Sequence, residues 1–230
     1  MRVRPNYVLE RELWGSGVRT VAGVDEVGVG ALAGPVVAAA VILAPDTIIE
    51  GLADSKLLTP KRGEALFTTI RELAVTFAIG RAEVEEVDRL NVYWAAMEAR
   101  RRAVEALRII PAHILVDGKR RIRGCRLAQT PVVDGDALSA SIAAASIVAK
   151  VTRDALMTEY GGRYPEYGFE RHKGYATAFH IAALGRLGAS VLHRRSYAPV
   201  WGLLGSNQQL ELWGQFGGTR LNSTIMSKDG

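Results

Sequence analysis

The sequence of 230 residues contains a single cysteine, Cys125, which excludes an internal disulfide. It also lacks a P-loop and any His/Cys cluster with the spacing of a zinc site. No apolar run reaches the roughly 18–20 residues that a membrane span needs, and the longest, at 36–44, is interrupted by Pro45. The first residues, MRVRPNYVLE, contain no signal-peptide core. We therefore expect a protein of the reducing cytoplasm that does not engage a membrane.

Positive charge is in excess and clustered. The formal net charge is +5 and the sequence pI is about 9.5, while 48% apolar and 23% charged residues are ordinary for a protein with a hydrophobic core. Residues 119–126, KRRIRGCR, contain five basic residues in eight, and 171–173 and 193–195 add more. Clustered Lys and Arg indicate a polyanion partner, with nucleic acid first, although a solvated basic surface would give the same composition.

The pattern of apolar residues predicts an α/β domain with a mixed sheet. Strands are predicted at 18–26, 35–43, 73–80, 112–118 and 129–137. Helices are predicted at 58–73, 136–160 and 176–187, and one or two helices at 82–108. The first strands are joined by short turns and should be antiparallel, whereas a later strand arrives by a helical crossover. We expect a catalytic domain at 1–160, a helical appendage at 161–202 and a flexible tail at 203–230.

Four acidic residues follow strands: Asp25, Glu26, Asp117 and Asp136. Ligands and catalytic groups of α/β sheets usually lie at strand ends. Converging carboxylates repel one another unless a cation compensates, and oxygen ligands favour Mg²⁺ or Mn²⁺. Two such ions are the common apparatus of phosphodiester hydrolysis. The same acids could instead be caps and surface charges, and for Asp136 a helix N-cap is an equal alternative.

The turn after the first acids, GVGALAG, has a second interpretation as a dinucleotide fingerprint. That motif needs a helix immediately after the glycines, which would present its N-terminus to a pyrophosphate. Here Pro35 and the run VVAAAVIL favour a strand, and two carboxylates before the turn would repel the pyrophosphate. This interpretation is therefore weak.

Taken together, residues 20–200 resemble ribonuclease HII. The matching segments occur in the family's order and are AGVDEVGVGALAGPVVAAAVIL, DSKLLTPKR, ILVDG, VVDGDALSASIAAASIVAKVTRDALM, HKGYAT and HRRSYAPV. The resemblance implies a ribonuclease H-like fold, with a mixed central sheet flanked by helices and a small helical C-terminal appendage. It also implies a metal-dependent endonuclease that cuts the RNA strand of RNA–DNA hybrids, leaves 5′-phosphates, and nicks DNA 5′ to embedded ribonucleotides, for ribonucleotide excision repair and primer removal.

The family's functional positions can be carried over residue by residue. Asp25, Glu26, Asp117 and Asp136 match its acidic metal-binding positions, which would hold two Mg²⁺ or Mn²⁺ ions with the scissile phosphate completing the site. Tyr175 matches the tyrosine that senses the RNA–DNA junction by stacking on a sugar. The remaining substrate-facing positions are Gly28, Val29 and Gly30 in the turn that contacts the ribose 2′-OH, together with Ser55, Lys56, Lys173, Arg194 and Ser196.

Two positions depart from the family's pattern. Val29 stands where the family usually has an arginine between the two glycines, which removes a charge-assisted bond worth roughly 1.5–3 kcal/mol. Asp134 stands where a basic residue is common and adds negative charge near the metals. An alternative function is therefore a hybrid-binding protein with impaired catalysis, and another is a two-metal nuclease without ribose specificity.

The partners that follow are RNA–DNA hybrids and DNA duplexes containing ribonucleotides. We expect a monomer without a membrane partner. The segment NQQLELW lies in the tail at 203–230 and gives thin support for contact with a replication clamp.

Overall fold

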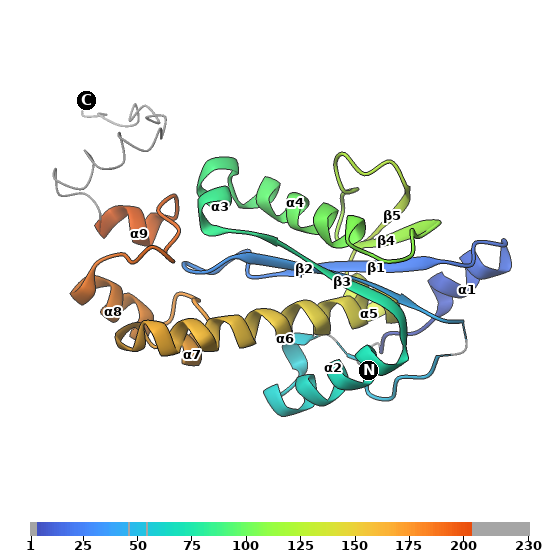
Figure 1. Ribbon diagram of the computed structural model, residues 1–230, viewed down its shortest axis with the longest axis horizontal. Coiled ribbons are helices and arrows are strands. Elements are labelled where there is room, and N and C mark those ends of the chain that lie inside the picture. The colour runs from blue at the N-terminus through green and yellow to red at the C-terminus, as the bar shows by residue number, and fades with distance from the viewer. Residues whose placement is uncertain (1–3, 46, 54, 204–230) are drawn as a thin grey trace, which may run out of the picture.

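The computed structural model describes residues 4–45, 47–53 and 55–203, which form a five-stranded mixed sheet flanked by helices (Figure 1). The strand order is β3-β2-β1-β4-β5. β1 and β2 are joined by a short turn and pair antiparallel, whereas β4 arrives after helices and pairs parallel with β1, as the sequence predicts. β3 pairs antiparallel with β2, and β5 pairs parallel with β4 although no helix connects these last two strands. The strands are β1 (Val21–Val27), β2 (Val36–Leu43), β3 (Ala74–Ala82), β4 (His113–Asp117) and β5 (Ala128–Val132).

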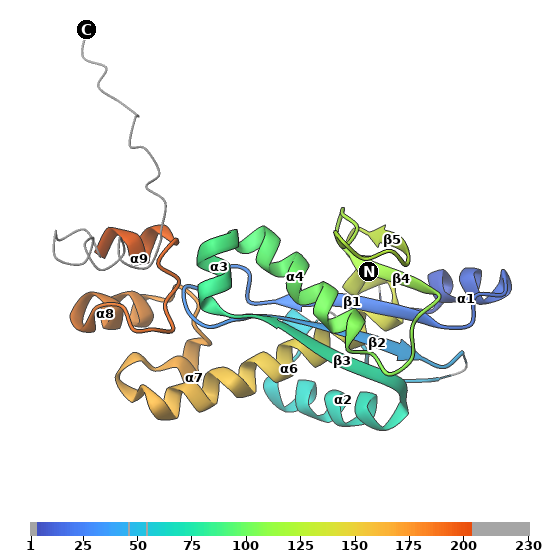
Figure 2. The ribbon, with the colours of Figure 1, turned by 45° about the horizontal axis from the view of Figure 1, so that its top comes forward.

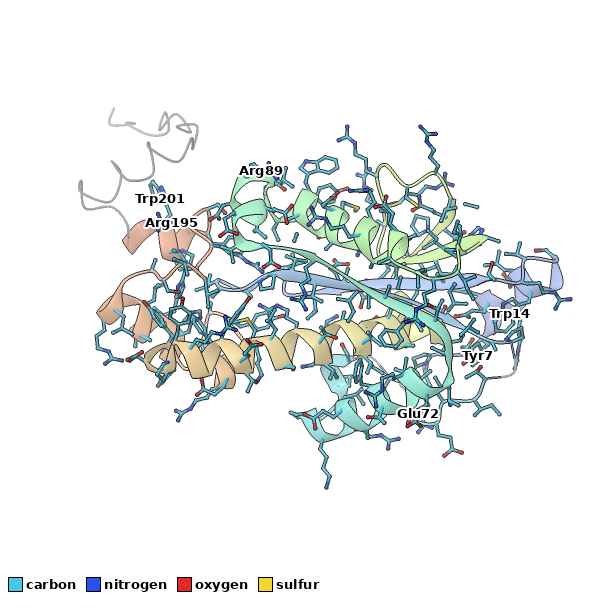
Figure 3. The ribbon with its side chains drawn as sticks, in the orientation of Figure 1. Tyr7, Trp14, Glu72, Arg89, Arg195 and Trp201 are labelled. Atoms are coloured by element: carbon cyan, nitrogen blue, oxygen red, sulfur yellow. The ribbon has the colours of Figure 1, made fainter. Side chains whose placement is uncertain are left out.

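The helices belong to three groups in space: α1 beside one end of the sheet, α2 to α6 on its two faces, and α7 to α9 at the other end (Figures 1 and 2). They are α1 (Val8–Gly15), α2 (Pro60–Leu73), α3 (Val84–Leu90), α4 (Val92–Glu105), α5 (Gly135–Leu138), α6 (Ala140–Arg163), α7 (Phe169–His172), α8 (Ala178–Leu187) and α9 (Ala198–Leu203). Tyr7 and Trp14 lie at the end opposite Arg195 and Trp201 (Figure 3).

The central strand β2 is apolar on both sides because helices cover both faces of the sheet. Ala38 and Ala40 pack with α4, whereas Ala39 and Val41 pack with α2 and α6. Every residue of β2 is buried, so its sequence is a continuous apolar run rather than an alternating one. At Gly23, α6 lies so close to β1 that a Cβ would stand 2.1 Å from the Ser141 carbonyl carbon.

The predicted helices are present, with differences at their ends. Thr59 caps α2, since its Oγ1 accepts from Arg62 N at 3.3 Å. Of the one or two helices predicted at 82–108, the structure has two, because Asn91 has a φ of 65° and its side chain caps α4. The strand predicted at 129–137 ends at Val132. α1 was not predicted, and α6 continues without a break through the expected domain boundary at 160/161.

The C-terminal helices are joined to the sheet by the segment after β1. Ala33 forms an isolated bridge with His193, and Leu32 N donates to Gly174 O at 2.8 Å. Beneath this junction, Met157 of α6 packs with Phe169 in a small apolar cluster. The turn at residues 28–30 is thereby brought to the same end of the molecule as Tyr175. In the part of the chain that the structure describes, no helix is long and apolar enough to cross a membrane.

Candidate active site

Acidic residues gather where β1 and β4 end. Val24 pairs with Val116 in the parallel ladder, so Asp25 and Asp117 are the next residues along adjacent strands. Asp136 lies in α5, directly after β5, and Gly135 N donates to Asp117 Oδ1 at 2.9 Å. Parallel strands place their carboxyl ends at one edge of a sheet. The fold therefore brings together the elements that carry all four predicted acids.

Asp25 is the most buried of these acids, with 6% of its surface exposed. Burial raises its pKa well above the usual range, and the neighbouring charges of Glu26 and Asp117 raise it further. Opposing these effects, Ser146 of α6 hydrogen bonds to the Asp25 carboxylate. Ser146 Oγ also lies 2.9 Å from Ser55 Oγ, so Ser55 contacts the site through a second hydroxyl.

Asp117 and Asp136 differ in their surroundings. The pKa of Asp117 is raised by burial, and the hydrogen bond from Gly135 N acts in the opposite direction. Asp136 is 7% exposed, and its Oδ2 lies 3.5 Å from Lys56 Nζ. Because the Lys56 side chain is 79% exposed, it places a mobile positive charge at the rim of the carboxylate group.

Glu26 points toward α4 and forms an ion pair with Arg100, but it lies near the end of β1, where its charge still raises the pKa of Asp25 and of Asp117. Alternation along β1 causes this orientation, since adjacent strand residues point to opposite faces. Arg100 is 6% exposed and lies among the buried alanines of α4. Sequence reasoning missed both Arg100 and Ser146. A charged residue at a core position of the helix at 92–105 was the available signal for Arg100.

The chemistry of these residues fits a hard divalent cation. Carboxylate oxygens are the donors that Mg²⁺ and Mn²⁺ prefer. Burial and the neighbouring carboxylates raise the pKa of Asp25, and a bound cation would offset both effects by favouring the charged form. Within residues 4–45, 47–53 and 55–203, no three Asp, Glu, His or Cys side chains are placed so that together they could hold one metal ion. Glu26 is paired with Arg100 and Asp136 with Lys56, so a complete coordination sphere requires further oxygen atoms or side-chain movement.

The glycine turn after β1 is rigid on one side and open on the other. Gly28 has a φ of 89°, and a Cβ there would lie 2.2 Å from Arg153 Nε, so only glycine fits. Gly30 has no protein atom within 4 Å of the Cβ position. Val29 is 36% exposed, and its carbonyl accepts from Arg194 Nη1 at 3.0 Å. The turn thus presents backbone and an apolar side chain to solvent.

Tyr175 lies next to this turn with 39% of its surface exposed. The guanidinium carbon of Arg153 is 5.5 Å from the centroid of its ring. Arg153 is fully buried and donates to Pro35 O and Ala33 O at 3.0 Å each, and to Lys173 O at 2.9 Å. One guanidinium therefore contacts the glycine turn, the segment before Tyr175 and the tyrosine ring.

Comparison with known proteins identifies the family. The family model of ribonuclease HII matches residues 22–200. The chain belongs to the ribonuclease HII family. It is 54% identical to ribonuclease HII of Anaeromyxobacter sp. (strain Fw109-5) over 89% of this chain and 64% of that protein. It is 52% identical to ribonuclease HII of Geobacillus kaustophilus (strain HTA426), over 87% of this chain and 76% of the relative.

Solved structures support the same fold. Ribonuclease H2 from Pyrococcus horikoshii OT3 matches with a TM-score of 0.66 and 27% identity, covering 80% of this chain and 96% of that one. Ribonuclease HII of Archaeoglobus fulgidus, solved in complex with PCNA, matches with a TM-score of 0.68 at 24% identity, covering 81% and 97%. The fold is ribonuclease H-like, as the sequence predicts. As a ribonuclease HII, the protein is an endoribonuclease of a divalent-metal-dependent family that acts on RNA–DNA hybrids.

One predicted substrate contact of this ribonuclease HII is corrected by the structure. Arg194 is fully buried. Its Nε and Nη2 donate to Gly34 O at 2.9 and 2.8 Å, and its Nη1 donates to Val29 O. The guanidinium N–H groups that could bind a phosphate therefore already donate to backbone carbonyls. Arg194 therefore holds the glycine turn from inside the protein and does not present its guanidinium to a substrate.

Two further predicted residues already have protein partners. Lys173 has a φ of 52°, and its Nζ donates to Thr158 Oγ1 at 2.6 Å and Glu170 O at 2.8 Å. Ser196 is exposed, but its backbone N and Oγ donate to Asp88 Oδ1 at 2.9 and 2.6 Å. Both lie in segments that neighbour Tyr175 or Arg194, and contact with a substrate would require them to exchange these bonds.

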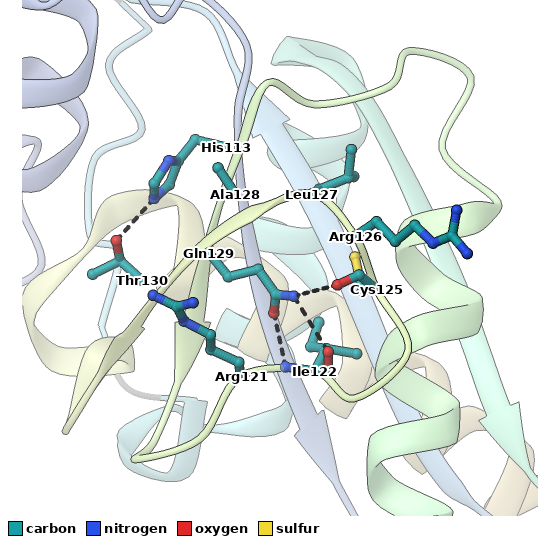
Figure 4. A pocket seen from close by; sticks show the side chains of 9 residues that line it. All are labelled: His113, Arg121, Ile122, Cys125, Arg126, Leu127, Ala128, Gln129 and Thr130. Carbon is teal, nitrogen blue, oxygen red and sulfur yellow. Dashed lines mark hydrogen bonds between the residues drawn. The ribbon is translucent and has the colours of Figure 1, made fainter.

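One cavity lies away from the acidic residues. It has a volume of about 580 Å³ and is lined by His113, Arg121, Gln129 and Thr130, among others (Figure 4). His113 begins β4 and Asp117 ends it, so the cavity and the acids lie toward opposite ends of this strand.

Proposed function

We propose that this ribonuclease HII requires Mg²⁺ or Mn²⁺, cleaves the RNA strand of RNA–DNA hybrids, and nicks duplex DNA 5′ to embedded ribonucleotides. The observation that carries the proposal is the carboxylate of Asp25 beside Glu26 and Asp117, because its burial and, after that, repulsion from these two neighbours raise its pKa. A protein that only binds nucleic acid gains nothing from such a group. A nuclease gains a position for divalent ions at the scissile phosphate.

In the proposed mechanism, Asp25, Glu26, Asp117 and Asp136 hold the ions, and the scissile phosphate supplies additional oxygen ligands. Bound ions would neutralise the phosphate, activate water and stabilise the leaving oxygen. Before binding, Arg100 and Lys56 compensate the charges of Glu26 and Asp136. Ser146 keeps the Asp25 carboxylate oriented. This arrangement supports substrate-assisted metal binding, in which metal affinity rises when the nucleic acid is present.

The proposed ribose selectivity rests on the turn at residues 28–30 and on Tyr175. Backbone groups of Gly28 and Gly30 would contact the 2′-OH, the group that distinguishes RNA from DNA. Open space at the Cβ position of Gly30 leaves room for a close approach of a sugar. Tyr175 would stack on the sugar after the ribonucleotide. Because Arg194 and Tyr197 both donate to Val29 O, the turn has its own support without the family's usual arginine.

The proposal is tested with a labelled DNA duplex carrying one ribonucleotide, incubated with Mg²⁺ or Mn²⁺ beside an all-DNA duplex. We expect a nick on the 5′ side of the ribonucleotide and no cleavage of the control. Asp25→Asn should lose at least about a hundredfold in kcat, since a metal-binding carboxylate is removed. The matched control is Asp154→Asn, because Asp154 pairs with Lys150 on α6 and should retain activity.

The outcomes separate the alternatives. Binding without cleavage in either metal would contradict the enzyme mechanism and favour the hybrid-binding function, and Val29→Arg would then be tested for rescue. Equal cleavage of the all-DNA duplex would contradict the ribose selectivity. The predicted clamp contact depends on the tail, of which residues 204–230 lie outside the described part of the chain.

A further inference from the structure

Three of the four histidines in this chain form one buried cluster that the proposed mechanism does not use. His172, His180 and His193 are 8%, 0% and 1% exposed. The rings of His172 and His180 are stacked with centroids 4.2 Å apart, and those of His180 and His193 are 5.2 Å apart. Phe169 contacts all three rings at centroid distances of 5.5–6.0 Å. Packed polar rings in such a place need a defined hydrogen-bond pattern.

The hydrogen bonds of two histidines fix where their protons lie. His180 Nδ1 lies 2.9 Å from Tyr175 O, and a carbonyl can only accept, so Nδ1 carries the proton. In the neutral ring, Nε2 of His180 is then an acceptor, and His193 Nε2 donates to it at 3.0 Å. His193 Nδ1 is left as an acceptor, and it receives Ser190 N at 3.0 Å and Ser190 Oγ at 2.8 Å. The chain of bonds therefore runs in one direction, from Ser190 to Tyr175.

The hydrogen bonds of the third histidine, His172, also fix where its proton lies, and one of them comes from Gly174, the residue before Tyr175. His172 Nε2 donates to Tyr167 O at 2.8 Å, and its Nδ1 accepts from Gly174 N at 3.2 Å. All the ring nitrogens in the cluster are thus paired when the three rings are neutral. Burial lowers the pKa of each of the three histidines, which favours this neutral state. Two of the bonds end on consecutive residues, Gly174 and Tyr175.

We propose that this histidine network is the positioning device that fixes the backbone at Gly174 and Tyr175 and so sets the selectivity for a ribonucleotide followed by DNA. The inference rests on the proposed role of Tyr175 as the junction-sensing residue. Gly174 links the network to the glycine turn, because Gly174 O accepts from Leu32 N at 2.8 Å. A Cβ at Gly174 would meet Ala33 O at 2.4 Å, so the two segments are in close contact. Releasing the histidines would let Tyr175 move relative to the turn.

Added protons would disrupt the network at defined places. A second proton on His180 Nε2 would face the N–H of His193, and one on His193 Nδ1 would face Ser190 N–H. A proton on His172 Nδ1 would face Gly174 N–H in the same way. Within the described residues, no carboxylate is hydrogen bonded to these rings. Charged and titratable groups surround the cluster on several elements. They are Glu170 and Lys173 beside His172, Arg171 over Phe179, Tyr167 beside His193, Tyr160 of α6, Tyr164 directly after α6, and Arg194, whose guanidinium faces Gly34.

The direction of the pH effect follows from the neutral state. Burial depresses the pKa of His193 to about 4. A histidine with a depressed pKa keeps its native bonds at neutral pH and loses them as the pH falls toward that value. Selectivity should therefore be complete at neutral pH and decline under acid conditions.

The test compares His180→Phe with wild type. Phenylalanine retains an aromatic ring in the core but removes the bonds to Tyr175 O and His193. The readout is the ratio of kcat/KM on a single-ribonucleotide duplex to kcat/KM on an RNA–DNA hybrid, because dividing the two cancels shared changes in metal binding and chemistry. We expect this ratio to fall about tenfold, with a much smaller change in kcat on the hybrid. The matched control, His113→Gln, removes the histidine outside the cluster and should retain the ratio.

Further measurements keep the inference falsifiable. Tyr175→Ala should lower the ratio, and adding His180→Phe to it should lower the ratio no further. An unchanged ratio in folded His180→Phe would overturn the positioning role. If the wild-type protein shows no nicking at ribonucleotides, the proposed function itself is overturned. Nitrogen-15 NMR of wild type tests the network even if the variant does not fold. We expect Nδ1–H for His180 and Nε2–H for His172 and His193, and any other pattern contradicts the inference.

Discussion

Among single residues, Asp25 carries a carboxylate whose negative charge makes the folded protein less stable. Its pKa is raised by burial and by the charges of Glu26 and Asp117, so ionisation at neutral pH costs folding free energy. A carboxyl group whose pKa is raised in the folded state contributes most below its unfolded pKa. That contribution is lost as the pH rises through the folded pKa. Function therefore requires a charge that the metal-free protein accommodates at the expense of stability.

We predict that Asp25→Asn is more stable than wild type at neutral pH without divalent metal, although it is inactive. The expected gain in the free energy of unfolding is about 1–3 kcal/mol, because one buried charge is removed. Urea denaturation with a chelator measures it. The difference should shrink toward about pH 4, where the wild-type carboxyl is protonated, and Mg²⁺ with substrate should reduce it as well. A variant less stable than wild type at neutral pH would contradict this explanation.

At the scale of elements, α6 connects the acids to the C-terminal helices. Its first turn lies against Gly23 of β1, and Ser146 hydrogen bonds to Asp25. Further along, Arg153 donates to Ala33 O and Pro35 O, which follow the glycine turn, and to Lys173 O before Tyr175. The helix is a rigid rod, so these contacts fix the separation between the proposed metal site and the proposed sugar-sensing site. Arg153 has no ion-pair partner among the described residues, and carbonyl oxygens alone satisfy it.

We predict that Arg153→Lys lowers the free energy of unfolding by about 2–4 kcal/mol. A lysine has one nitrogen and cannot reach Pro35 O, Ala33 O and Lys173 O together. The control is Arg163→Lys on the same helix, where the side chain is 64% exposed and pairs with Glu159. That change should cost less than about 0.5 kcal/mol. Equal effects in urea denaturation would mean that the buried carbonyl contacts do not contribute to stability.

Local patterns predicted most of the elements but few of the contacts between them. Apolar periodicity and the Thr59 cap were sufficient for the strands and for α2. The sequence left open whether residues 82–108 form one helix or two, because a positive φ at Asn91 depends on the packing of α3 and α4. The elements carrying the acids were predicted from strand ends, whereas Arg100 required knowing which helix covers β1. The family resemblance placed Arg194 on the substrate-facing surface, whereas its burial depends on carbonyls of the distant segment at residues 29–34.

For the whole molecule, the distribution of positive charge suggests how a duplex is held. The basic loop, residues 118–127, starts directly after Asp117 and carries five of the chain's cations. Gln129 fixes the loop, since its side chain bonds to Ile122 N, Ile122 O and Cys125 O (Figure 4). Arg123 stacks 4.8 Å from the centroid of Trp94. None of these cations forms an ion pair within the described residues, so their charge is available to phosphates.

We predict that replacing Lys119, Arg120 and Arg121 by glutamine weakens binding of a long ribonucleotide-containing duplex by about tenfold at moderate salt. The slope of log affinity against log salt should decrease by about one to three, as fewer counterions are released. The acids are untouched, so kcat at saturating substrate should be retained. The control replaces Arg11, Arg71 and Arg163 by glutamine. These arginines are exposed on three different helices, and their replacement lowers the formal net charge by the same amount.

These two variants separate local contact from overall charge. If the basic loop touches the duplex, only the first variant changes the salt slope, and duplexes shortened on one side should become less sensitive to it. The side on which shortening removes the effect then gives the direction in which the duplex crosses the molecule. Equal losses in both variants would mean that net charge alone attracts the substrate, and the loop would not be a specific contact.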